Sequence, residues 1–282
     1  MQQEDIHFIH LSDLHVLPAE ACGLWELDGA RNLRAVLDAV REMDVTPAFF
    51  LITGDLADNG EPASYQRLLV ILDEMESLGT PVLLGLGNHD HRVPFRQVVL
   101  RESDADEEQR YFYSRMIGDL RVIVLDSKVS GAVHGDLSPE QLEWLKEELS
   151  EPAPEGTVLA LHHPPFRNGI PFLDDHTLRN ADALRQLLVG SDSDVLGILT
   201  GHTHVAGFST FANVACVTAP GTAFLLDPST QKGIRMLGGT GFNLVSLRQG
   251  TLTVSPVLLP GGRPEIYHLR PEEMVAMLGY TR

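Results

Sequence analysis

Short hydrophobic runs alternate with longer amphipathic stretches between residues 7 and 203. The runs cover residues 7–11, 49–53, 81–85, 158–161 and 195–200. Between them, apolar residues at helical spacing predict helices over residues 28–43 and 61–78, and from about residue 178 to residue 188. A further helix begins after Ser138, an N-cap serine that Pro139 follows. The pattern therefore predicts βαβ units with buried strands.

Two regions depart from this alternation. Residues 111–114 and 120–126 predict an antiparallel pair around a Gly118-Asp119 turn. After Gly207, apolar runs at 214–218, 233–237, 242–247 and 251–259 predict strands of one second sheet, which would complete a β-sandwich flanked by helices. Residues 271–278 predict a short terminal helix. We expect one domain over residues 1–260 and a C-terminal tail over residues 261–282.

Composition is that of an ordinary globular protein, with 282 residues of which 43% are hydrophobic and 21% are charged. The sequence contains no run of 18 apolar residues, so we expect no membrane span, and its first residues lack the pattern of a signal peptide. Cys22 and Cys216 lie in no C-x-x-C pair, which favours two reduced thiols. These features favour a cytoplasmic protein.

The formal net charge of −18 bears on the partner. Proteins that bind nucleic acid polymers usually present basic faces, and a field of this sign would repel a polyanion. We therefore expect a small molecule as partner and no nucleic acid polymer, and the lack of an apolar span argues against a membrane.

Five short polar segments follow the five hydrophobic runs, either at once or after one residue. They are Asp13-Leu-His15, Gly54-Asp55, Gly87-Asn88-His89-Asp90, His162-His163-Pro164-Pro165 and Gly201-His202-Thr203-His204. Open α/β sheets place their active sites at the carboxyl ends of the strands, so these segments are expected to meet. Six of the twelve histidines lie in them. Carboxylate, amide and imidazole groups are suitable ligands for divalent metals.

Such a set suits the hydrolysis of a phosphodiester. Two divalent cations roughly 3.5–4 Å apart neutralise the phosphoryl oxygens and generate hydroxide near neutral pH. Asn88 offers a neutral oxygen ligand, and His89 beside it is left for acid or charge-stabilising work, with Asp90 as the carboxylate that orients it. Asp58 is expected to orient a ligand or to cap a helix. Oxygen and nitrogen ligands suit Fe, Mn, Zn and Co alike, so the metal's identity stays open.

In their order, the segments resemble the calcineurin-like metallophosphoesterase superfamily, whose pattern is D-x-H, G-D-x-x-(D), G-N-H-(D/E), H and G-H-x-H. The His-His-Pro-Pro segment and residues 12–15, 140–145 and 178–181 resemble the class III cyclic-nucleotide phosphodiesterases and the related glycerophosphodiesterases. The resemblance spans residues 7 to about 204. It implies an α/β fold, a four-layer α/β/β/α sandwich with two mixed β-sheets.

The resemblance also implies a role for each site residue. One metal would be bound by Asp13, His15 and His204, the second by Asn88, His202 and one histidine of the 162–163 pair, and Asp55 would bridge them. His162 is favoured over His163 because it ends the apolar strand. His89 would sit beside the leaving-group oxygen as proton donor or charge stabiliser. Asn88, His89 and His204 are expected to contact substrate, and His163 and His176 are weaker candidates for that role.

We therefore expect a dinuclear-metal phosphodiesterase that attacks small phosphodiesters with a metal-bound hydroxide. Cyclic 3′,5′-nucleotides of the cAMP type are the first candidate, and the alternative is a glycerophosphodiesterase or a broad-specificity phosphodiesterase or phosphatase. A non-catalytic scaffold would be expected to lose ligands, and none is missing. The negative net charge disfavours a nuclease. Asp58 occupies the position where a purple acid phosphatase would have a tyrosine ligand, which disfavours that class.

Residues 222–241 form a Gly-rich excursion after the last motif. They predict a cap or oligomerisation hairpin, in which an exposed apolar stretch at residues 224–226 would form a subunit contact. We expect a homodimer or a larger homo-oligomer in which this segment narrows the site toward small diesters.

Overall fold

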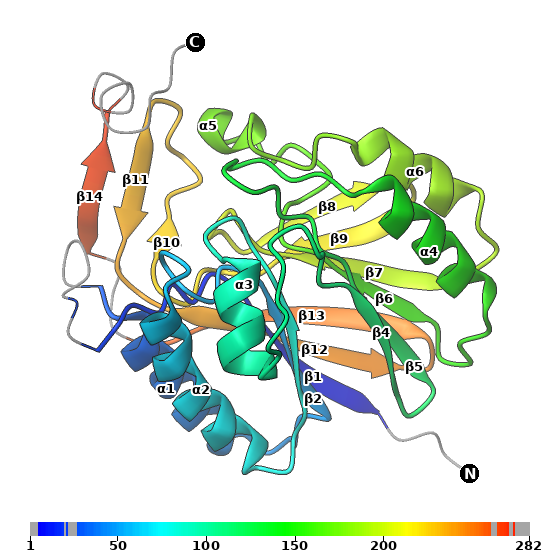
Figure 1. Ribbon diagram of the computed structural model, residues 1–282, viewed down its shortest axis with the longest axis horizontal. Coiled ribbons are helices and arrows are strands. Elements are labelled where there is room, and N and C mark those ends of the chain that lie inside the picture. The colour runs from blue at the N-terminus through cyan, green and yellow to red at the C-terminus, as the bar shows by residue number, and fades with distance from the viewer. Residues whose placement is uncertain (1–4, 20, 22–26, 261–263, 271–272, 274–282) are drawn as a thin grey trace.

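The computed structural model describes residues 5–19, 21, 27–260, 264–270 and 273. Two central sheets lie face to face (Figure 1). The five-stranded sheet has the order β13 (Thr251–Leu258), β12 (Gly241–Arg248), β1 (Ile6–Leu11), β2 (Phe49–Thr53) and β3 (Val82–Gly85). The six-stranded sheet has the order β4 (Tyr113–Ile117), β5 (Leu120–Val124), β6 (Thr157–Ala160), β7 (Val195–Thr200), β9 (Val214–Thr218) and β8 (Gly207–Phe211).

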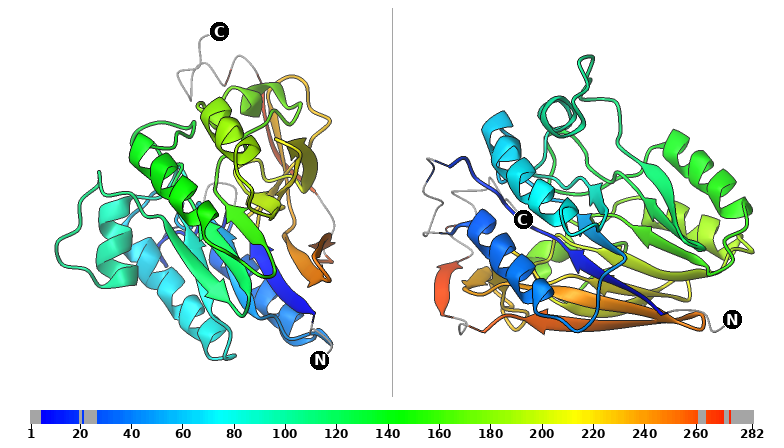
Figure 2. Two further views of the ribbon diagram at one scale, coloured as in Figure 1. Left: turned by 90° about the vertical axis from the view of Figure 1, so that its right-hand side faces the viewer. Right: turned by 90° about the horizontal axis from the view of Figure 1, so that it is seen from below.

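Helices cover the outer faces of both sheets. The helices α1 (Gly29–Arg41) and α2 (Pro62–Glu76) pack on the five-stranded sheet, whereas α4 (Pro139–Ser150) and α6 (Ala181–Val189) pack on the six-stranded sheet. The two helix pairs lie on opposite sides of the molecule (Figure 2). The order of layers is therefore α/β/β/α, which confirms the predicted fold class.

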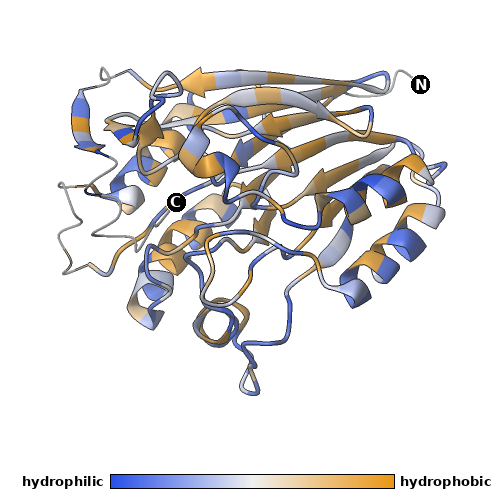
Figure 3. Cartoon of the chain, turned by 90° about the horizontal axis from the view of Figure 1, so that it is seen from above, coloured by the Kyte–Doolittle hydropathy of each residue, from blue (hydrophilic) through white to orange (hydrophobic). Residues whose placement is uncertain are grey.

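Hydrophobic burial holds the layers together. Between the sheets, Phe8, Phe49 and Leu51 of one sheet pack against Val122 and Val158 of the other. Hydrophobic residues are concentrated in the central strands (Figure 3). A second core under α1 and α2 and a third under α4 and α6 bury the opposite faces of the same strands. Because both faces are buried, these strands are nearly continuous apolar runs, and the sequence pattern located them for that reason.

Local signals fix the helix starts. The Asp28 side chain accepts a hydrogen bond from the Arg31 N–H at the start of α1. Ser138 caps α4 in the same way by accepting from the Gln141 N–H, and Pro139 occupies the first helical position. Shorter helical pieces, α3 (Arg92–Phe95), the π-helix η2 (Arg96–Leu100) and α5 (Pro171–Asp174), connect the main elements.

The prediction that the four runs after Gly207 form one second sheet is wrong. One run, β9, lies beside β7 in the six-stranded sheet, and two others, β12 and β13, extend the five-stranded sheet. The fourth, β11 (Ile234–Leu237), pairs with β10 (Leu225–Leu226) and β14 (Glu265–Leu269) in a separate three-stranded sheet. An apolar run shows that a strand is buried, but it does not show against which layer it is buried.

Several other expectations concern the ends of the chain and its cysteines. The helix predicted at residues 271–278 lies outside the described residues, apart from residue 273, and so does Cys22. The described part of the predicted tail contributes β14, and the domain boundary near residue 260 stays a prediction. Cys216 is buried and forms no disulfide. None of the helices in the described ranges has the length and hydrophobicity needed to cross a membrane.

Candidate metal centre

The predicted ligands meet at the carboxyl ends of β1, β2, β6 and β7 and after β3. They leave the strands through unusual backbone turns: five of the nine non-glycine residues with positive φ in the described chain are Asp13, His15, Asp55, His202 and His204. Positive φ is costly for residues with a side chain, and such strain clusters at functional sites. Each left-handed residue breaks the extended path, so that Asp13 and His15, two residues apart, face one point.

One half of the ligand set joins Asp13, His15 and His204. The Nε2 atoms of His15 and His204 lie 3.2 Å apart, and His204 Nε2 lies 3.5 Å from Asp13 Oδ1. The other ring nitrogen of each histidine faces an acceptor: His15 Nδ1 lies 3.0 Å from Asp58 Oδ1, and His204 Nδ1 lies 3.1 Å from the Phe224 carbonyl oxygen. Both Nδ1 atoms therefore carry the hydrogen, and both Nε2 atoms present lone pairs to each other.

The second half joins Asn88, His162 and His202. Asn88 Oδ1 lies 3.2 Å from His162 Nε2 and 3.0 Å from His202 Nδ1. His162 Nδ1 donates to the Thr53 carbonyl at 2.8 Å, so Nε2 is the ring nitrogen that faces Asn88 Oδ1 and is placed to bind a cation.

Asp55 lies between the two halves. Its Oδ2 atom is 3.6 Å from His15 Nε2 and 3.3 Å from His162 Nε2. Its Oδ1 atom accepts the His89 backbone N–H at 2.9 Å, which fixes the carboxylate. Gly54 and Gly87 allow this close approach, because a Cβ on Gly54 would lie 2.6 Å from the Gly87 nitrogen. The position suits a bridging ligand.

The chemistry of this donor set fits divalent cations. Lone pairs of buried oxygen and nitrogen atoms converge, which is unfavourable unless positive charge lies among them. Burial by itself lowers the pKa of His162, but the Asp55 and Asp13 carboxylates raise it to about 9. Burial raises the pKa of Asp13 to about 6. The same environment that stabilises a proton on His162 would stabilise a metal ion.

The structure distinguishes His162 from His163. A ring nitrogen of His163 lies within 4.8 Å of ligand atoms of His162 and His202. However, both ring nitrogens of His163 already have partners: Nδ1 lies 2.8 Å from Ser127 Oγ, and Nε2 lies 3.0 Å from the Val133 carbonyl oxygen. His162 is therefore the better candidate for the ligand, which is also the residue that the sequence favours, whereas His163 is a buried residue in contact with the Val133 loop.

The prediction that Asp90 orients His89 is wrong. His89 Nδ1 lies 2.7 Å from the Asp58 carbonyl oxygen, which takes that role. Asp90 is fully buried and accepts four hydrogen bonds, from the N–H groups of Leu56, Ala57 and Gly87 and from the Tyr65 hydroxyl. Neighbouring side chains on this tight turn point apart, so Asp90 ties the two ligand turns together while His89 is exposed. The Asp58 carboxylate faces Nδ1 of His15, a contact that suits the orienting role expected for it.

A cavity of about 470 Å³ opens beside the ligand set. His15, Asp55, Asn88, His89, His202 and His204 line one side, together with Asp58. The remaining lining residues form an apolar wall, which consists of Leu17, Leu27, Val133, Phe172, Leu173, Ala223, Phe224, Leu226, Ile234, Met236 and Leu269. Much of this wall belongs to the three-stranded sheet. None of the described residues that line the cavity is a lysine or an arginine.

The structure bears on two sequence expectations for residues near this apolar wall. The stretch at residues 224–226 was expected to be exposed, but Leu225 and Leu226 are 5% and 8% exposed, and the Phe224 ring stacks on His204 with centroids 4.0 Å apart. Its apolar residues cover the site instead of forming an exposed contact surface. His176 hydrogen-bonds the Phe172 carbonyl oxygen at 2.7 Å and is not among the described residues that line the cavity.

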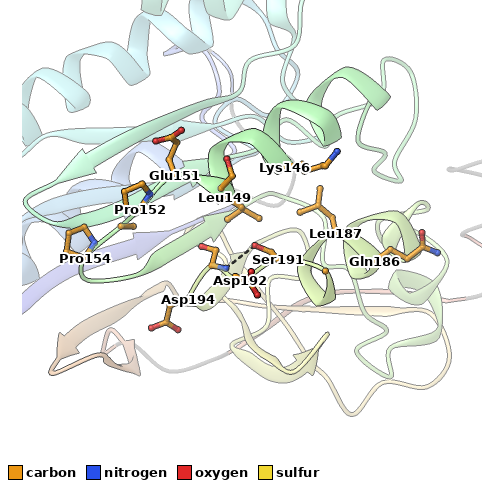
Figure 4. Close-up of a pocket in the computed structure, with 14 residues that line it drawn as sticks. Lys146, Leu149, Glu151, Pro152, Pro154, Gln186, Leu187, Ser191, Asp192 and Asp194 are labelled. Atoms are coloured by element: carbon orange, nitrogen blue, oxygen red, sulfur yellow. Dashed lines mark hydrogen bonds between the residues drawn. The ribbon is translucent and has the colours of Figure 1, made fainter.

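A second cavity, of about 800 Å³, lies beside the loops that precede β6 and β7, at the amino ends of these strands (Figure 4). It is bounded by the C-terminal parts of α4 and α6 and by the loops that follow them, with Leu149, Pro152 and Leu187 among its lining residues. None of the predicted site residues lines it.

The parts of the site that sequence reasoning missed are mainly backbone carbonyls and apolar side chains. The carbonyl groups of Thr53, Asp58 and Phe224 orient three histidines, and no sequence signal marks a carbonyl group. Met236 and Leu269 were not assigned to the site because apolar residues in strands indicate burial in general. The one available signal was the predicted position of residues 222–241 over the site.

Comparison with known proteins shows which family the sequence of this chain matches. The sequence model of the calcineurin-like phosphoesterases matches residues 6–206. A cAMP/cGMP dual specificity phosphodiesterase of Mycobacterium tuberculosis is 35% identical over 261 residues, which cover 92% of this chain and 81% of that protein. A probable cyclic nucleotide phosphodiesterase of Rhodococcus erythropolis is 37% identical, over 90% of this chain and 84% of that protein.

Two more distant matches, one by sequence and one by structure, are in line with this family. A probable glycerophosphodiester phosphodiesterase of Arcobacter nitrofigilis is 27% identical, over 75% of this chain and 76% of that protein. Among solved structures, a dimetal phosphatase from Danio rerio superposes with a TM-score of 0.65 at 17% identity, over 93% of this chain and 99% of that chain. At this level of identity the superposition shows a shared fold.

Proposed function

This chain belongs to the calcineurin-like phosphoesterase family, and from that premise we propose that it hydrolyses 3′,5′-cyclic nucleotides with two divalent metal ions. The observation that carries the proposal is the cavity, which joins a two-part ligand set to an apolar wall. The ligand set suits a phosphodiester group, and the wall suits the organic part of the substrate.

The proposed ligands are the residues that converge at the strand ends. Asp13, His15 and His204 would hold the first ion, Asn88, His162 and His202 the second, and Asp55 both. When bound, two such ions neutralise phosphoryl oxygens and activate water as a nucleophile. The donor set is compatible with Fe, Mn, Zn or Co.

Other residues of the chain would protonate the leaving group and contact the substrate. His89 lies at the cavity and is held through Nδ1 by the Asp58 carbonyl, so its Nε2 is available to the substrate. We assign it the donation of a proton or hydrogen bond to the leaving-group oxygen. Asn88 and His204, which also line the cavity, are placed to contact the phosphodiester.

The apolar wall favours a cyclic nucleotide over a glycerophosphodiester. A nucleobase is a planar group that gains from contact with Phe172, Leu226 and Met236, whereas a glycerol headgroup is polar and would be desolvated there without partners. The two cyclic-nucleotide relatives are also more similar to this chain than the glycerophosphodiesterase relative.

Rates on a substrate panel test this function. Chain reconstituted with Mn²⁺ would be assayed with cAMP, cGMP, glycerophosphocholine and bis(p-nitrophenyl) phosphate. We expect kcat/KM to be at least about 10-fold higher for a cyclic nucleotide than for glycerophosphocholine, the size of effect that one apolar contact can give. The reverse order would make the glycerophosphodiesterase the correct assignment.

A substitution in the apolar wall tests whether this wall contacts the nucleoside. Met236→Ala should raise KM for cAMP while changing the rate on bis(p-nitrophenyl) phosphate less, because the wall contacts the nucleoside. Met116→Ala is the matched control, since Met116 is 44% exposed on β4 and does not line the cavity. Equal effects of the two substitutions would contradict a nucleoside site at this wall.

Assembly and location stay predictions. We propose a cytoplasmic homo-oligomer, but residues 224–226 do not support the subunit contact expected from the sequence, because their apolar side chains cover the site. Light scattering at micromolar concentration would decide between monomer and oligomer.

A further inference from the structure

One buried histidine of β1 has no part in the proposed ligand set. His10 is 0% exposed, and burial lowers its pKa to about 3, so its ring is neutral. Its Nδ1 atom lies 3.3 Å from Asn243 Nδ2, and its Nε2 atom lies 3.0 Å from Thr53 Oγ1. Because the amide nitrogen donates, Nδ1 accepts, and the ring hydrogen on Nε2 is donated to Thr53. The Thr53 hydroxyl in turn donates to the Leu11 carbonyl at 3.3 Å.

The two residues that His10 contacts, Asn243 and Thr53, each also hydrogen-bond the six-stranded sheet or the turn that follows one of its strands. Asn243 Nδ2, on β12, also lies 3.4 Å from the Thr218 carbonyl oxygen on β9. At the other end, the Thr53 carbonyl on β2 accepts from His162 Nδ1, which follows β6. His10 therefore connects two links between the sheets. Farther from the metal centre, the same interlayer space is filled by apolar side chains such as Phe8 and Phe49.

We propose that His10 is a positioning residue that sets the separation of the two sheets at the metal centre. The inference rests on the proposed two-metal function. The five-stranded sheet supplies the turns with Asp13, His15, Asp55 and Asn88, whereas the six-stranded sheet supplies those with His162, His202 and His204. Every ligand set that spans both sheets depends on their separation.

The two ions should not depend on His10 equally. The first ion would take three ligands from the five-stranded sheet and only His204 from the six-stranded sheet. The second ion would take two from each, and one of these, His162, is bonded directly to Thr53. A change in sheet separation therefore disturbs the second site more than the first.

Metal titration of the apoprotein tests this asymmetry. In His10→Leu, we expect the dissociation constant of Mn²⁺ at the second site to rise about 10–100-fold, the usual effect of losing a residue that orients ligands. The first site should change by less than about threefold, well below that range. Asn88→Ala, which removes a ligand of the second ion alone, identifies the second site in the calorimetric titration.

His7→Leu is the matched control. His7 lies on the same strand and also bonds β12, with Nδ1 2.8 Å from Ser246 Oγ, but it is near the start of the strand, away from the ligands. We expect both Mn²⁺ sites to be unchanged in this variant. His10→Gln, which offers both a donor and an acceptor, should recover part of the second-site affinity lost in His10→Leu.

A second variant tests the same proposal if His10→Leu does not fold. Thr53→Val removes the hydroxyl that His10 contacts and keeps the carbonyl that His162 contacts, so it should show the same selective loss. Equal weakening of both ions in these variants, or an unchanged second site, would overturn the role of His10 and leave the proposed function intact. Fewer than two ions in the wild-type protein would overturn both.

Discussion

Asp55 shows most directly how one residue serves two halves of the candidate site. Its Oδ2 atom lies within 3.6 Å of both His15 Nε2 and His162 Nε2, and a positive φ of 49° points it there. We expect Asp55→Ala to weaken both metal sites, because its Oδ2 atom faces one proposed histidine ligand of each half. Metal analysis after gel filtration checks this, with Asp13→Ala as a comparison that should affect mainly the first site. Two tightly held ions in Asp55→Ala would exclude the bridging role.

His89 is expected to act on the substrate instead of holding metal. Its Nδ1 atom is occupied by the Asp58 carbonyl, and its ring packs edge-on against His15 at 4.7 Å between centroids. His89→Ala should keep near-normal metal content and slow turnover by roughly 10²–10⁴-fold, the usual range for acid–base catalysis. The loss should be smaller for diesters with a p-nitrophenol leaving group, which needs less protonation. An equal loss for good and poor leaving groups would contradict a leaving-group acid.

At this scale, the sequence indicated which side chains meet but not how they are oriented. Short motifs after apolar runs were enough to group Asp13, His15 and the Gly201–His204 turn, because strand ends share an edge. Orientation depends on contacts between residues far apart in sequence, such as that between His162 and the Thr53 carbonyl. The role assigned to Asp90 failed for the same reason, since its four partners come from three separate segments.

At the scale of elements, α2 supports the ligand turns through Tyr65. The Tyr65 hydroxyl donates to Asp90 Oδ1 at 2.9 Å and accepts the His91 N–H at 2.9 Å. Tyr65→Phe leaves the buried Asp90 one partner short, and a hydrogen bond to a charged group contributes about 1.5–3 kcal/mol. We expect a loss of that size in the free energy of unfolding, measured by urea denaturation. Val70→Ala, at an exposed position of the same helix, is the control and should change it by less than about 0.5 kcal/mol.

The elements themselves were predictable where periodicity is strong. The expected helix at residues 28–43 is α1, and the expected turn at Gly118-Asp119 joins β4 to β5. Sheet membership after Gly207 was not predictable, because β9, β11 and β12 have similar apolar runs but pair with β7, β14 and β1, respectively. Pairing depends on which edge each strand reaches, and local pattern carries no information about that.

For the whole molecule, the family-matched region and the later segment have different tasks. Residues 6–206 match the family and contain all the proposed ligands. Phe224, Leu226, Met236 and Leu269, which follow that region, build much of the apolar wall of the cavity. Substrate preference is thus expected to depend on a segment that lies outside the ligand motifs.

Metal should stabilise the whole fold, since each ion would bind side chains from both central sheets. A ligand that binds only the folded state stabilises it by about 2.7 kcal/mol at 100 times its dissociation constant. For a chain of this size, that corresponds to a rise in Tm of roughly 5–10 °C for each ion. Thermal unfolding followed by circular dichroism, with and without Mn²⁺ after treatment with a chelator, measures the effect. Asp55→Ala should lose most of the Mn²⁺-dependent rise, and a wild-type Tm independent of Mn²⁺ would show that the ions do not link the sheets.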